Sequence, residues 1–77
     1  MDINHQIIDR IGVLHETGTG WTFEVNTVSW NGAEPKIDLR NWLHSEGKVG
    51  KGITLTEDEA RQLVKLLSAY LEGKEGA

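Results

Sequence analysis

The sequence predicts an α+β domain in which four antiparallel strands are followed by one C-terminal helix. The chain has 77 residues and no cysteine, enough for one small domain without disulfides or thiolate-metal sites. Four segments rich in β-branched and aromatic residues are separated by turn sequences, and consecutive strands joined by short loops form an antiparallel sheet. The last segment carries apolar residues at helical spacing. We expect this helix to cover one face of the sheet.

The first two strands are expected over residues 5–14 and 21–30, with the turn sequence ETGTG between them. In the first strand Ile7, Ile11 and Val13 share one parity, although neighbouring aliphatic residues interrupt the alternation. The second strand is rich in aromatic and β-branched residues, which favour strands.

The second and third strands are predicted to form a hairpin. Residues 31–35 begin with Asn-Gly and end with proline, which is typical of a hairpin loop, and residues 36–43 form the third strand. This loop places Trp30 opposite Lys36, and directly opposed residues share a face of the sheet. The apolar face, expected to belong to the core, holds Phe23, Val25, Ile37, Leu39 and Leu43. The opposite face, expected to be solvent-exposed, holds Trp30, Asn26, Lys36, Arg40 and Trp42.

The fourth strand is expected to be short, over residues 53–56, after a loop of residues 44–52 that contains three glycines. It runs directly into the helix. Thr56 is a natural N-cap, and Glu59, three residues later, completes a capping box. Gly73 is expected to end the helix.

The apolar stripe of the helix is wider than one small sheet needs. Seven residues, Leu66 among them, span about 160° on a helical wheel, against roughly 100° for a typical surface helix. Leu66 is then either a partly exposed leucine or part of a contact with a second copy of the chain. The second interpretation predicts a homodimer whose interface holds Leu63, Leu66, Leu67 and Tyr70. The folded domain is expected over residues 1–72, and the Gly-rich, charged residues 73–77 are expected to fray.

Two tryptophans share the polar face of the hairpin with cationic and amide side chains. Aromatic rings stack on bases of any sequence, and neighbouring cations neutralise phosphates. The net charge of −4 argues against a nucleic-acid partner, but residues 36–52 carry four cationic side chains against two acidic ones. The ligand indicated is single-stranded, because a duplex hides its base faces. On this hypothesis Trp42 packs against a base rather than the core, and Asp38 and Glu24 orient Arg40.

The segment KIDLRNW, followed by a loop and by GKGITLTEDEARQLVKLL, resembles the positive cofactor four family of transcriptional coactivators, most of all its small bacterial YdbC-like branch. The resemblance covers about residues 5–72. It implies a strongly curved sheet, a homodimer formed through the helices, and a groove that binds single-stranded DNA with little sequence preference. By position, it places groove aromatics at Trp30 and Trp42, an arginine at Arg40 and a lysine at Lys51.

Three further residues complete the candidate nucleic-acid site. Lys36 and Asn26 share the face that bears the tryptophans, and Lys48 adds to the basic character of the neighbouring loop. We expect a role in transcription regulation or another part of DNA metabolism. RNA is an alternative ligand, because stacking and phosphate contacts do not distinguish the two polymers.

The competing hypothesis is a protein-interaction module that docks a partner chain on the face bearing Trp30 and Trp42. A variant of it has that face covered by a partner subunit or by the N-terminal strand. The cations beside the two tryptophans favour nucleic acid, since a peptide-docking face would not need them.

The sequence carries no pattern of catalytic residues. The three histidines are scattered without metal-ligand spacing, and GKVGKG lacks the full phosphate-loop pattern. We therefore expect a protein that is not an enzyme and takes no metal, cofactor or small-molecule substrate. No apolar run approaches the length of a membrane span, and no signal-peptide pattern opens the chain. The expected location is the cytoplasm, with association with the nucleoid as an option.

Overall fold

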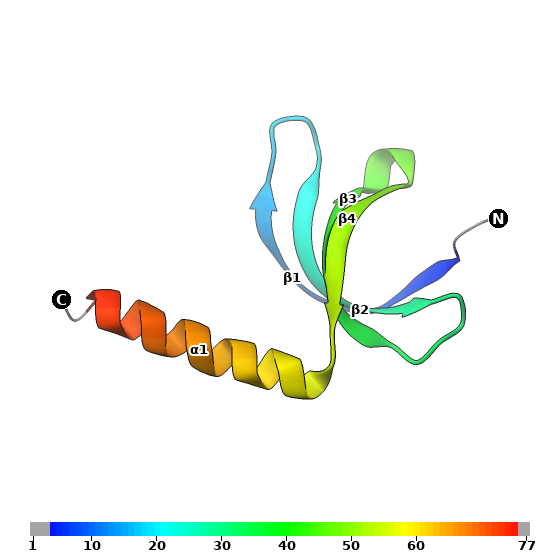
Figure 1. Ribbon diagram of the computed structural model, residues 1–77. Coiled ribbons are helices and arrows are strands. Elements are labelled where there is room, and N and C mark those ends of the chain that lie inside the picture. The colour runs from blue at the N-terminus through cyan, green and yellow to red at the C-terminus, as the bar shows by residue number, and fades with distance from the viewer. Residues whose placement is uncertain (1–3, 76–77) are drawn as a thin grey trace.

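The computed structural model describes residues 4–75 as a curved four-stranded sheet followed by one long helix (Figure 1). The elements are β1 (His5–Glu16), β2 (Thr22–Trp30), β3 (Lys36–Leu43), the 3-10 turn η1 (His44–Glu46), β4 (Lys48–Leu55) and α1 (Glu57–Glu75). The strands pair antiparallel in chain order, β1-β2-β3-β4. The predicted four antiparallel strands and C-terminal helix are confirmed.

The β2–β3 hairpin turns at the Asn-Gly step, where φ is positive at both residues, 52° and 77°. The strand ladder begins with Val28 opposite Lys36, so the predicted pairing of Trp30 with Lys36 is wrong by two residues. The reason is a longer loop: the Ala33 amide donates to the Trp30 carbonyl at 3.0 Å, and the Ser29 hydroxyl donates to the Ala33 carbonyl at 2.6 Å. A shift of two residues leaves every side chain on its predicted face.

β1 is an edge strand with three register shifts against β2. The extra residue at each shift is Ile8, Ile11 or Leu14. The predicted grouping of Ile7, Ile11 and Val13 is therefore wrong for Ile11, which sits in an irregularity without a partner on β2. Extra residues of this kind bend a strand and increase its twist, and β1 curves strongly along its length (Figure 1).

β4 begins at Lys48, so most of the segment predicted as a Gly-rich loop is a strand. Two of its glycines allow close packing rather than a turn. A Cβ at Gly52 would lie 2.2 Å from the Leu39 carbonyl oxygen, so β3 and β4 approach this closely only without a side chain there. A Cβ at Gly50 would lie 3.1 Å from the Trp21 ring, which shows that Trp21 packs against the β4 backbone.

The predicted capping box at the start of α1 is confirmed. The Thr56 amide donates to the Glu59 carboxylate at 2.8 Å, and the Glu59 amide donates to the Thr56 hydroxyl at 3.1 Å. The hydrogen bond from the Thr56 amide to the carboxylate is the main cause that lowers the pKa of Glu59. The helix continues through Gly73 to Glu75, so its predicted end is wrong; glycine costs a helix only about 1 kcal/mol and does not break it. Of the predicted frayed tail, residues 76–77 lie outside the described residues.

α1 projects away from the sheet instead of covering one of its faces, which corrects the predicted packing (Figure 1). Only Thr56 separates β4 from α1, and so short a connection leaves no loop that could turn the helix back. The radius of gyration is 14.5 Å, against about 11 Å for a compact domain of this length. The apolar stripe is left open to solvent, with 49–63% exposure at Val64, Leu66, Leu67, Tyr70 and Leu71.

The most buried residues lie on the sheet face that was predicted to be solvent-exposed. This concave face holds the buried residues Glu24, Asn26, Val28, Asp38 and Trp42. On the opposite, convex face, Leu43 is buried but the predicted core residues Phe23, Val25, Ile37 and Leu39 are only half-buried. The assignment of the core to the convex face is therefore wrong for a single chain. Curvature crowds side chains together on the inner face, and no helix covers the outer one.

Candidate nucleic-acid interface

Four rings from different parts of the chain form one cluster on the concave face. Trp30 and Trp42 lie 12° from parallel, with centroids 6.3 Å apart. His44 stacks on Trp42 at 5.5 Å and 7°. His5 contacts Trp30 at 5.5 Å and Trp42 at 5.2 Å. We call His5, Trp30, Trp42 and His44 the ring cluster.

Trp42 is at the centre of the ring cluster and is only 2% exposed. The expectation that its ring stands on the wet side is therefore wrong, because its neighbours cover it. The exposed ring surface lies instead on Trp30, which is half-buried, and on His5 and His44. Among the described residues, the Trp42 indole nitrogen is also the one buried side-chain nitrogen or oxygen without a hydrogen-bond partner.

Asp38 holds the Arg40 guanidinium, which is the cation of the site, in one orientation. Its carboxylate is fully buried and accepts hydrogen bonds from the Arg40 guanidinium, including one of 3.0 Å, and from the Trp30 indole at 3.3 Å. Arg40 also donates to the Gly50 carbonyl at 3.2 Å. Its guanidinium lies 4.7 Å from the centroid of the Trp30 ring, within the range of a cation–π contact. The expected orientation of Arg40 by a carboxylate is confirmed for Asp38.

Glu24 orients a histidine rather than Arg40. Its buried carboxylate accepts hydrogen bonds from the Thr22 hydroxyl, from the Asn26 amide at 3.1 Å and, with the proton on Nε2, from His44 at 2.8 Å. Burial alone would raise the pKa of Glu24, but these hydrogen bonds outweigh it and the pKa lies below its usual value. Arg10 lies 4.0 Å away and adds a weaker ion pair.

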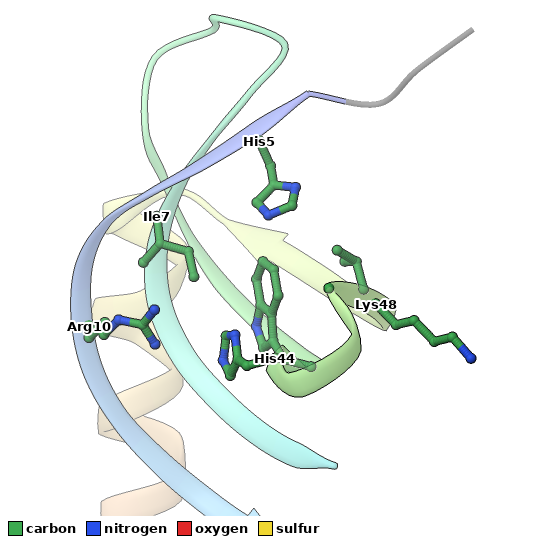
Figure 2. A pocket seen from close by; sticks show the side chains of 8 residues that line it. His5, Ile7, Arg10, His44 and Lys48 are labelled. Carbon is green, nitrogen blue, oxygen red and sulfur yellow. The ribbon is translucent and has the colours of Figure 1, made fainter. Parts of the chain in front are cut away.

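Two adjoining cavities flank the ring cluster and together form a groove across the concave face. One, of about 350 Å³, is lined by Trp42 and by the side chains that Figure 2 labels, among them Arg10 and His44. The other, of about 270 Å³, is lined by Trp30 and Arg40. His5 lines both cavities.

The structure brings four of the seven predicted site residues to this groove: Trp30, Arg40, Trp42 and Lys48. Asn26 is 1% exposed and supports Glu24 from below. Lys36 lines neither cavity and lies beside the β2–β3 loop. Lys51 is exposed and falls in the register shift of β4, also outside both cavities.

Three groove residues with ionisable side chains have no role in the sequence-based prediction: His5, Arg10 and His44. His5 faces Trp30 across the β1–β2 ladder, but the irregular register of β1 could not be read from its aliphatic pattern. In the sequence, His44 is only one of three histidines without metal-ligand spacing. Two features could have indicated its role in the site. Trp42 lies two residues earlier at the end of β3, and the acidic residue Glu24 lies on the adjacent strand β2.

Metal binding and membrane crossing by a helix have no structural support among the described residues. Between residues 4 and 75, no group of three or more histidine or acidic side chains is placed to hold a metal ion. In the same range, no helix is long and apolar enough to cross a membrane.

Comparisons with known proteins agree with this description. A sequence model of the family described as "Transcriptional Coactivator p15 (PC4)" matches residues 17–66, which include Trp30, Arg40 and Trp42 but not His5 or Arg10. An uncharacterized protein from Treponema pallidum (strain Nichols) is 38% identical over 68 residues, which cover 88% of this chain and 80% of that protein.

Proposed function

Because this chain belongs to the PC4 family, a non-enzymatic family for which single-stranded DNA binding is the general activity, we propose that its concave face binds single-stranded DNA with little sequence preference. The observation that carries the proposal is the ring cluster with Arg40 held over Trp30 by buried Asp38. Flat bases stack on exposed rings, and a preoriented guanidinium contacts phosphate or a base edge.

The charges around the groove suit an anionic polymer, although the net charge of the whole protein is negative. The carboxylates of Glu24 and Asp38 are engaged by internal donors. Arg10 is 65% exposed, and Lys48 forms only a solvent-exposed ion pair with Glu46 at 3.3 Å. Exposed pairs of this kind contribute little, about 0–1 kcal/mol, so a phosphate can replace Glu46.

In the proposed complex, the predicted residues act in two ways. Trp30, Arg40 and Lys48 contact the DNA directly, while Trp42 and Asn26 hold the rings and Glu24 in place. Lys36 and Lys51 lie outside the groove, where they guide the strand as it enters and leaves. We propose that the protein serves transcription regulation or another part of DNA metabolism, in the cytoplasm where that DNA lies.

We also propose that the protein is a homodimer formed through α1 and the convex face, with Leu63, Leu66, Leu67 and Tyr70 in the interface. Within the described residues only three apolar side chains are buried: Val28, Trp42 and Leu43. Domains this small have a thin stability margin and often gain stability by association. A second copy covering α1 would complete the core. We further propose membership of the small bacterial YdbC-like branch, in keeping with the relative matched over 80% of its length.

The proposed DNA contact is tested by the salt dependence of binding. Removing one phosphate contact should make the slope of log K against log salt shallower by about 0.7. Lys48→Ala should show this change with oligo-dT, because Lys48 lines the groove. Lys65→Ala, which removes the same charge from exposed α1, is the matched control. Equal slopes for the two variants would contradict the placement of DNA in the groove.

A further inference from the structure

The cavity beside Trp42 has the size and lining of a small-ligand site. Its volume of about 350 Å³ falls within the range of roughly 300–1,000 Å³ found for such sites. Figure 2 shows the side chains of His5, Ile7, Arg10 and His44 gathered around it, and the Lys48 ammonium pointing away from them.

His44 presents a fixed, partly exposed ring to this cavity. Its imidazole stacks on Trp42, and its Nε2 lies 2.8 Å from the Glu24 carboxylate. Contact with a buried ring and a buried carboxylate sets the plane of the imidazole. The His44 side chain nevertheless remains 41% exposed. A ring held flat with open surface is a stacking platform for an unpaired base.

The Trp42 indole nitrogen is enclosed by the protein and is not accessible from the cavity. Its Nε1–H is buried and has no acceptor among residues 4–75. Leaving a buried donor without an acceptor costs free energy, and most buried polar groups in proteins are paired. Trp42 also lines the cavity. Trp42 therefore contributes to this site as the ring on which His44 stacks.

We propose that this cavity is a subsite for one nucleobase of the bound strand. The base stacks on His44, and Arg10, which lines the same cavity, pairs with a phosphate of the same strand. Glu24 is the positioning residue, because it fixes the His44 ring. The inference rests on the proposed single-stranded DNA binding, and it predicts little base preference because all bases share a flat face.

The test compares oligo-dT with an abasic deoxyribose-phosphate oligomer of equal length, by anisotropy of a labelled strand. We expect His44→Ala to weaken oligo-dT binding roughly fivefold or more and to leave the abasic strand unaffected. His44→Phe, which keeps a flat ring, should retain most of the oligo-dT affinity. His15→Ala is the matched control, since His15 lines neither cavity.

The outcomes separate this subsite from the general function. A native protein that binds neither polymer would overturn the proposed DNA binding itself. Binding to oligo-dT with His44→Ala equal to His15→Ala would overturn the subsite alone. Equal losses on both strands after His44→Ala would also overturn it, because they would indicate a charge contact rather than stacking.

Discussion

Replacing Trp42 with alanine should destabilise the fold as well as weaken DNA binding. Trp42 is almost fully buried and its ring contacts His5, Trp30 and His44. Truncating a buried tryptophan to alanine typically costs about 3–5 kcal/mol of unfolding free energy. The same change removes the unpartnered Nε1–H, whose burial itself costs about 1–3 kcal/mol. The middle of each range gives an expected net loss of about 2 kcal/mol.

Thermal unfolding followed by circular dichroism measures this loss. In a domain of this size each kcal/mol lowers Tm by about 4–8 °C, so Trp42→Ala should melt about 8–16 °C below the native protein. Trp30→Ala is the matched control: its ring is only half-buried, so it should lose less stability while it still weakens oligo-dT binding. If Trp42→Ala melts within a few degrees of the native protein, Trp42 is not a core residue and the description of the ring cluster is wrong.

Three further predictions concern assembly, acid stability and strand packing. Leu66→Glu should give monomer or unfolded chain in sedimentation, whereas Ser68→Glu, on the other side of α1, should not; a dimer of unchanged mass would place the interface elsewhere. The pKa of Glu24 is lower in the folded protein than its ordinary value of 4.5, so its contribution to stability is present above that value and is lost as the pH falls below it. Glu24→Gln should remove this part of the acid dependence, and an unchanged acid-unfolding curve would contradict it. Gly52→Ala would place its Cβ 2.2 Å from a β3 carbonyl oxygen and should lower Tm sharply, whereas Gly12→Ala meets no atom within 4 Å; similar melting of the two would contradict the close β3–β4 approach.

The order and type of the elements were predictable because their signals are local. The Asn-Gly step marks the β2–β3 turn, and the third strand has the predicted bounds. The capping box formed by Thr56 and Glu59 marks the start of α1. The glycines of residues 44–52 led to the wrong prediction of a loop, because a glycine can mark either a turn or a close approach of two strands. Gly52 marks a close approach of β3 and β4.

The buried face was not predictable because it depends on how the whole sheet bends. Alternation along β2 and β3 separates the two faces correctly, but it does not say which face becomes concave. The curvature is linked to the irregular pairing of β1, where Ile8, Ile11 and Leu14 are unpaired. A flat sheet covered by α1 would bury Phe23 and Val25 as expected. The curved sheet buries the opposite face instead.

The candidate site was predictable only where its residues belong to one hairpin. Trp30, Arg40 and Trp42 were placed on one face from the parity of β2 and β3, and the structure brings them together. The contacts of His5 and His44 join β1, β2 and η1 through tertiary packing. Such contacts carry no periodic signal in the sequence.

The most direct test of the central claim is a titration of the native protein with oligo-dT, followed by tryptophan fluorescence. Trp30 is the partly exposed ring of the groove and contacts Arg40. Stacking of bases should quench the fluorescence at low salt, and added salt should restore it as phosphate contacts are lost. Unchanged fluorescence at low salt, together with no change in the anisotropy of a labelled oligo-dT, would contradict single-stranded DNA binding by this face.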